Sequence, residues 1–150
     1  MIKKISIAFF FLVWVVPIFA KNTKVQKPII KKISQSGLSA SIKRGKVVYA
    51  TYCLSCHQAD GGGVPNMNPP LIQTSYVLGD KYSLIKIVLK GFQKPVDIDG
   101  ESYSNNMPAL NSLKDQQIAD VLTYIRNNFD NKGSAVVKTE VQKVRNSLRR

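Results

Sequence analysis

Two cysteines and a histidine stand within five residues, as Cys53-Leu54-Ser55-Cys56-His57. The chain of 150 residues has two cysteines and one histidine in all, so chance placement rarely gives this C-x-x-C-H arrangement. Two thiols three residues apart at the end of a helix can reach the two vinyl groups of one porphyrin, and the adjacent imidazole can ligate its iron. C-x-x-C-H is the attachment signature of c-type haem. It predicts one covalently attached haem c with His57 as an axial ligand.

Two other interpretations of the cysteines stay open. A thioredoxin-like redox pair also uses C-x-x-C, but it normally starts a helix after a strand, where the helix dipole lowers the pKa of a thiol. A structural disulfide is permitted outside the cytoplasm, but it leaves the adjacent His57 unexplained. Because the motif follows an expected helix over 41–52 and no βαβ pattern surrounds it, we favour the haem interpretation.

The sixth position of the iron has to be filled by another side chain, and with no second histidine the candidates are methionines. Met1 belongs to the N-terminal segment, which leaves Met67 and Met107. Met107 precedes Pro108, and a residue before proline favours an extended backbone. It also lies far enough along the chain to reach the opposite face of the ring, whereas Met67 is close in sequence to His57. We therefore predict Met107 as the distal ligand.

Four helices and a small hairpin are expected to position these residues, which makes the fold class all-α. The second helix, 81–90, has Asp80 to cap its start and Gly91 to end it. The first helix covers 41–52, and apolar spacing places the third around 118–125 and the fourth around 141–148. Capping boxes are expected at Ser112 with Asp115 and at Thr139 with Gln142, and a hairpin over 96–103 turns at Asp99-Gly100.

Length and composition suit one globular domain with extensions at both ends. Residues 1–20 have two lysines ahead of an apolar stretch, which is typical of an export signal that is either cleaved or kept as an anchor. We expect a basic linker over 21–40, the domain over 41–131, and a basic extension over 132–150 that forms a short helix packed on the domain. Export places the protein in the periplasm, or on the outside face of the membrane if the signal is kept.

The net charge of +13 is concentrated at the two ends of the chain. Residues 47–131 carry six basic and eight acidic side chains, so the middle of the chain is slightly acidic. Basic ends favour redox partners with acidic docking surfaces, or association with a membrane surface. Nucleic-acid binding is not expected, because the chain carries an export signal and no recognised binding motif.

Over residues 41–129 the chain resembles a class I cytochrome c. Gly45 and Tyr49 match the glycine and the aromatic residue on the first helix of that family. Residues 106–110 (Asn-Met-Pro-Ala-Leu) match its distal-ligand loop, and Tyr124 matches the aromatic residue of its last core helix. The resemblance implies the cytochrome c fold, with about four helices around one haem, in which the last core helix crosses the first at the glycine.

The resemblance also implies particular roles. Pro70 is implied to offer its carbonyl to the second ring nitrogen of His57, which orients the ring. Residues 121–127 and the tail 139–145 resemble small bacterial cytochromes that accompany membrane or periplasmic dehydrogenases and reductases, although a tryptophan commonly stands where this chain has Phe129. The implied function is single-electron transfer without catalysis by this chain alone. The alternatives are a dedicated haem subunit of a larger dehydrogenase or reductase, and a colourless thiol–disulfide exchanger.

Overall fold

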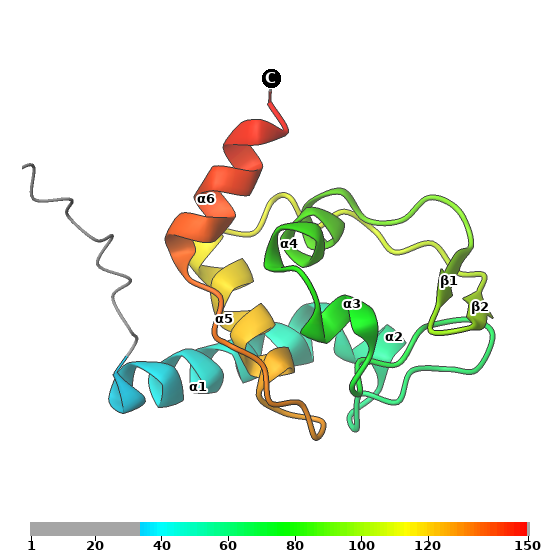
Figure 1. The fold of residues 1–150 in the computed structure, drawn as a ribbon, viewed down its shortest axis with the longest axis horizontal. Helices are drawn as coiled ribbons and strands as arrows, with labels where there is room; N and C mark the ends of the chain where they lie inside the picture. Colours follow the sequence, from blue (N-terminus) through cyan, green and yellow to red (C-terminus); the bar gives the residue numbers. More distant parts are fainter. Residues whose placement is uncertain (1–33, 150) are drawn as a thin grey trace, which may run out of the picture. The chain divides into compact units, whose positions relative to one another are not determined.

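The computed structural model describes residues 34–149, and its helices and strands confirm a mainly helical fold with one small hairpin (Figure 1). The predicted signal and most of the predicted linker lie outside these residues. None of the helices within 34–149 is long and apolar enough to cross a membrane. In chain order the elements are α1 (Gln35–Tyr52), α2 (Leu54–His57), α3 (Ser75–Leu78), α4 (Lys81–Lys90), β1 (Val96–Ile98), β2 (Glu101–Tyr103), α5 (Asp115–Arg126) and α6 (Lys138–Ser147).

Helices α1 and α5 cross at Gly45, as the resemblance implied (Figure 1). A Cβ atom added to Gly45 would lie 2.1 Å from the carbonyl oxygen of Asp120 and 2.7 Å from Cβ of Tyr124. Only glycine therefore allows the two backbones to approach this closely. Beside the crossing, the buried Asp120 carboxylate accepts hydrogen bonds from the Ser41 hydroxyl at 2.6 Å and from the Arg44 guanidinium at 2.7 and 2.8 Å.

Helix α1 begins at Gln35, six residues before the predicted start at Ser41. Ser34 has an extended backbone, and its side chain accepts a hydrogen bond from the Gly37 N–H at 3.3 Å. This is the usual way in which serine caps a helix. Residues 35–40 of the predicted linker are therefore helical. Gly37 concealed this start, because glycine lowers the helix propensity of the first turn.

The predicted bounds of α4 and of the hairpin are confirmed. The Asp80 carboxylate accepts a hydrogen bond from the Ser83 N–H at 2.8 Å, and Gly91 ends the helix with φ of +67°. Strands β1 and β2 pair antiparallel around Asp99 and Gly100, whose φ angles are +53° and +93°. Two consecutive residues with positive φ are characteristic of a two-residue type I′ turn.

The capping boxes predicted for α5 and α6 are wrong. Neither Ser112 nor Thr139 is the N-cap. At α5 the Gln117 side chain accepts a hydrogen bond from the Lys114 N–H at 3.0 Å, and at α6 the Glu140 carboxylate accepts one from the backbone N–H just before the helix at 2.8 Å. In both helices the third residue satisfies the N-cap N–H, as it does in a capping box, without a serine or threonine at the N-cap.

Helix α6 packs against α4 and α5 (Figure 1). Val141 and Val144 are buried on the packed side. The Arg145 guanidinium makes an ion pair with Asp115 at 2.7 Å and donates to two carbonyls of the segment 111–113, each at 2.7 Å. The C-terminal helix is thus fixed to the start of α5 by both apolar and polar contacts.

Candidate cofactor site

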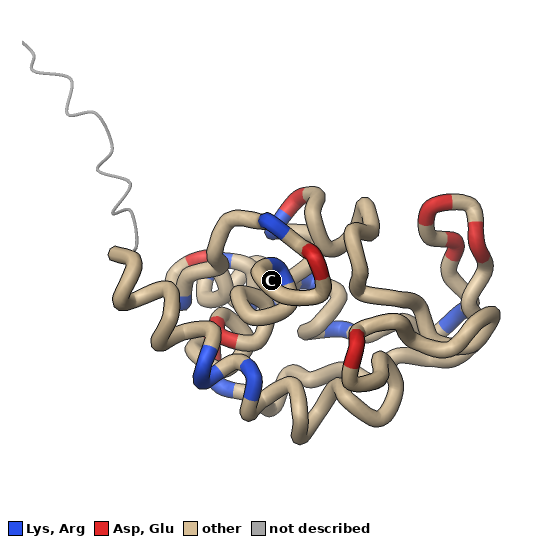
Figure 2. Tube along the Cα trace, turned by 90° about the horizontal axis from the view of Figure 1, so that it is seen from below, with Lys and Arg blue, Asp and Glu red and all other residues tan. Residues whose placement is uncertain are grey.

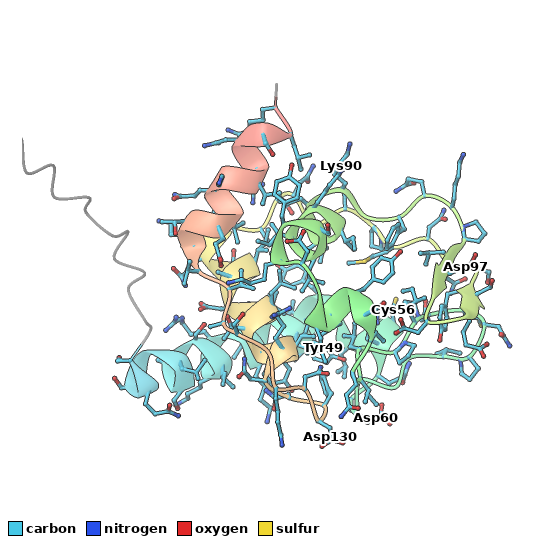
Figure 3. All side chains as sticks on the ribbon, viewed as in Figure 1. Tyr49, Cys56, Asp60, Lys90, Asp97 and Asp130 are labelled. Atoms are coloured by element: carbon cyan, nitrogen blue, oxygen red, sulfur yellow. The ribbon has the colours of Figure 1, made fainter. Side chains whose placement is uncertain are left out.

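Four of the predicted site residues, Cys53, Cys56, His57 and Met107, line one hollow. Cys56, which is labelled in Figure 3, belongs with His57 to the short helix α2, which follows α1 after Cys53. Met107 comes from the loop between β2 and α5. The fold therefore brings the thioether of Met107, which is distant in the sequence, to the same hollow as the two thiols and the imidazole.

A second hollow adjoins the first and shares Cys53, His57 and Met107 with it. Its wall is almost entirely apolar, which suits a ligand with a large apolar body. Besides the two cysteines and His57, the polar side chains of the first hollow come from tyrosine, serine and asparagine, which are uncharged. The apolar wall of the second hollow includes Leu71, Val77, Leu84, Ile87, Val88, Phe92, Ile98, Leu110, Val121, Leu122 and Ile125.

His57 is held through one of its two ring nitrogens. Its Nδ1 lies 2.9 Å from the carbonyl oxygen of Pro69, which can only accept, so Nδ1 carries the proton and donates. This tautomer leaves the lone pair of Nε2 free for a metal. Burial lowers the pKa of His57, against an opposing effect of the Pro69 hydrogen bond, and so favours the neutral imidazole that binds metals.

The expectation that Pro70 supplies this carbonyl is wrong, because the acceptor is Pro69. Two consecutive prolines offered two carbonyls, and the sequence did not distinguish them. In the structure the Leu71 N–H donates to the Gly61 carbonyl at 2.7 Å, which fixes the path of the chain after the prolines. Pro70 itself lies in the wall of the apolar hollow.

The cysteines are both free thiols, and Cys53 is the more buried of the two. Burial, with a smaller contribution from neighbouring Cys56, raises the pKa of Cys53 to about 11. Reactive redox cysteines normally have a lowered pKa. The pair also follows α1, and no strand precedes it within residues 34–149. The arrangement therefore disfavours a thioredoxin-like redox pair and a thiol–disulfide exchanger.

The Met107 loop is fastened to the end of α4. Phe92 and Met107 exchange two backbone hydrogen bonds of 3.0 Å, and the Leu110 N–H donates to the Val88 carbonyl at 2.9 Å. A Cβ atom added to Gly91 would lie 2.1 Å from the Met107 carbonyl oxygen. The sequence identified Gly91 only as the residue that ends the helix. Its lack of a side chain also allows the Met107 loop to approach the end of α4.

Met67 is placed differently. Its side chain is 47% exposed, and it does not line either hollow. Its carbonyl accepts a hydrogen bond from the Asn105 N–H at 3.0 Å, so this loop supports the distal loop through its backbone. Of the two methionines that the sequence left as candidates, Met107 has the position suited to a distal ligand.

These residues fit a covalently bound haem. The two thiols can form thioethers, the free Nε2 of His57 and the sulfur of Met107 can occupy the two axial positions, and the apolar wall can enclose the porphyrin. All four residues line the same hollow, and the Pro69 carbonyl already holds the imidazole in the required tautomer.

Comparison with known proteins gives one family match and several relatives. The family model for cytochrome c matches residues 42–129. The chain is 36% identical over 93 residues to cytochrome c-552 of Thermus thermophilus, which covers 59% of this chain and 62% of that protein. It is 35% identical over 123 residues to the cytochrome c subunit of the alcohol dehydrogenase (quinone) of Gluconacetobacter polyoxogenes, and 34% identical over 124 residues to the gluconate 2-dehydrogenase cytochrome c subunit of Pantoea cypripedii. Each of these two matches covers 80% of this chain but 26% of the subunit, so the chain spans less than two thirds of these relatives.

Proposed function

Because the chain belongs to the cytochrome c family, whose members are electron-transfer proteins with covalently attached haem, we propose that it carries single electrons between redox partners. Cys53 and Cys56 would form the thioethers that attach the haem, and His57 and Met107 would hold its iron. When bound, the haem supplies one-electron chemistry by cycling between ferric and ferrous iron. The observation that carries the proposal is that these four side chains line one hollow.

Residues around the site are expected to set the reduction potential of the haem iron. The Pro69 carbonyl accepts a hydrogen bond from the Nδ1–H of His57, which orients the ring and makes the imidazole a better electron donor to iron. A methionine ligand raises the reduction potential, and the apolar wall favours the less charged state. If His57 and Met107 both held the iron, it would have no open position for a substrate.

The test is whether the colour is covalently attached. We expect protein made together with a cytochrome c maturation system to show a redox-dependent visible spectrum, and the pigment to stay with the polypeptide after acid–acetone extraction. The double variant Cys53→Ala, Cys56→Ala is the matched control, and its pigment should extract. A wild-type pigment that washes out with the solvent, or a purified protein without iron, would contradict the proposal.

Export is part of the proposal. The two lysines and apolar run of residues 1–20 support transfer to the periplasm, or retention on the outside face of the membrane. Sequencing the N-terminus of the mature protein distinguishes these outcomes, since a cleaved protein begins after Ala20 and an anchored one keeps Lys3 and Lys4. Protein that stays in the cytoplasm would contradict export.

A second candidate function is that of a dedicated haem subunit in a larger dehydrogenase or reductase. The observation that favours it is the similarity, over 80% of the chain, to proteins named as cytochrome c subunits of alcohol and gluconate dehydrogenases. It predicts tight co-purification with a catalytic partner from the native source. A free electron carrier instead separates from its partners during purification.

A further inference from the structure

We infer that Asn131 is a positioning residue for the axial histidine, an inference that rests on the proposed role of His57. The Asn131 side-chain amide ties the loop that follows Pro69 to the end of α5. It therefore fixes the carbonyl to which the His57 ring donates. Residue 131 lies beyond the range 42–129 matched by the family model.

Both polar atoms of the Asn131 side-chain amide have hydrogen-bond partners. The residue is 5% exposed, and its Oδ1 accepts a hydrogen bond from the Gln73 N–H at 2.7 Å. Its Nδ2 donates to the carbonyl of Leu71 and to that of Ile125, each at 2.8 Å. Asparagine has two N–H donors and one carbonyl acceptor, so each of these groups has a partner. No other side chain of this size supplies the same set.

The contact at Leu71 reaches His57 through two prolines. The Leu71 carbonyl is held by Asn131, and its N–H donates to the Gly61 carbonyl at 2.7 Å, so Leu71 is fixed on both sides. Between Leu71 and Pro69 stands only Pro70, whose ring fixes φ. A displacement of Leu71 is therefore transmitted to the Pro69 carbonyl rather than absorbed by a flexible link.

The backbone on both sides of this contact is strained. Gln73 has φ of +51°, and Phe129 and Asp130 have φ of +56° and +58°. Non-glycine residues keep such conformations only where surrounding contacts hold them. The Asn131 side-chain Oδ1 accepts a hydrogen bond from the Gln73 N–H. The Asn131 backbone N–H donates to the Asn128 carbonyl at 3.0 Å. The tight turn after α5 thus aims the Asn131 side chain at the loop beside the histidine.

The experiment compares Asn131→Ala with Asn127→Ala and Asn128→Ala in the full chain. The controls remove amides at the same helix end that donate only to the carbonyls of Thr123 and Tyr124, each at 2.9 Å. Loss of the Asn131 amide should loosen the Pro69 carbonyl, weaken the imidazole as a donor and shift the equilibrium toward ferrous iron. We expect a shift of about tenfold, a rise of about 59 mV for one electron.

Two further measurements complete the test. In the wild-type protein the backbone amide proton of Gln73 should exchange with solvent as slowly as the backbone amide protons at the end of α5. In Asn131→Ala it should exchange about tenfold faster. Wild-type exchange at the rate of an open loop would overturn the inference even if Asn131→Ala did not hold haem. A potential for Asn131→Ala equal to those of the controls would overturn it while leaving the proposed function intact. A wild-type protein without covalent haem would overturn both.

Discussion

Met107 and Met67 offer a matched pair of substitutions, because one side chain lines the hollow and the other is 47% exposed. We expect Met107→Ala to remove the axial thioether, lower the reduction potential by about 59 mV or more, which is tenfold in the ferric/ferrous ratio, and open the iron to carbon monoxide. Met67→Ala should change neither property. Potentiometric titration and spectra with and without carbon monoxide measure both effects. An unchanged potential and spectrum for Met107→Ala would reject it as the ligand.

The site residues differ in how far the sequence could identify them. Cys53, Cys56 and His57 could be predicted because covalent haem attachment requires a fixed local spacing. The Met107 prediction needed elimination and the adjacent proline. Pro69 and Asn131 act through groups whose partners depend on tertiary structure: any residue has a backbone carbonyl, and an asparagine near a helix end usually faces water. Their roles became visible only when α5 and the proximal loop were seen together.

At the scale of elements, the junction between α4 and the distal loop gives a second matched pair. Gly91 and Gly100 both have positive φ, but an added Cβ would lie 2.1 Å from the Met107 carbonyl oxygen at Gly91 and meets nothing within 4 Å at Gly100. Gly91→Ala should therefore displace the Met107 loop and lower the reduction potential, whereas Gly100→Ala should only reduce stability, by about 1–2 kcal/mol. Potentiometry and urea unfolding separate the two effects, and equal potentials would show that Gly91 does not position the ligand.

Helix α6 gives a prediction about stability. Arg145 joins the Asp115 carboxylate and two carbonyls before α5, each at 2.7 Å, whereas Arg149 is exposed. Arg145→Ala leaves the partly buried acceptors at Asp115 and Leu113 without their donor, so the free energy of unfolding should fall by about 1–3 kcal/mol. Arg149→Ala should change it by less than about 0.5 kcal/mol. Urea denaturation measures both, and equal losses would mean that α6 is held by its apolar face alone.

The bounds of the elements were predictable where one residue acts locally. Asp80 and Gly91 delimit α4, and Asp99-Gly100 forms the hairpin turn, because each depends on its own backbone preferences. The starts of α5 and α6 were missed, since their N-caps are a lysine and a valine, which have no capping preference of their own. Tertiary packing decides the position of such helix starts.

At the scale of the whole molecule, charge is unevenly distributed along the chain. Residues 34–149 contain 14 lysines and arginines against nine aspartates and glutamates, so only five of the 13 net positive charges lie there. Within these residues the acidic residues Asp97, Asp99 and Glu101 lie in the hairpin of β1 and β2, where Figure 2 shows a group of red segments. No lysine, arginine, aspartate or glutamate lines the first hollow. Most of the long-range positive field must therefore come from the ends of the sequence.

This charge distribution predicts that the rate of electron transfer depends on salt concentration. A chain cut after Ala20 loses Lys3 and Lys4 and keeps a net charge of +11, so its oxidation by ferricyanide should slow as ionic strength rises from about 0.01 to 0.15 M, where the Debye length falls from about 30 to 8 Å. Oxidation by a cationic cobalt(III) complex should accelerate over the same range. Replacing the five lysines between residues 21 and 32 by glutamine lowers the charge to +6 and should flatten both dependences. Rates independent of salt with both oxidants would show that the basic ends are passive, and would remove the support for partners with acidic docking surfaces.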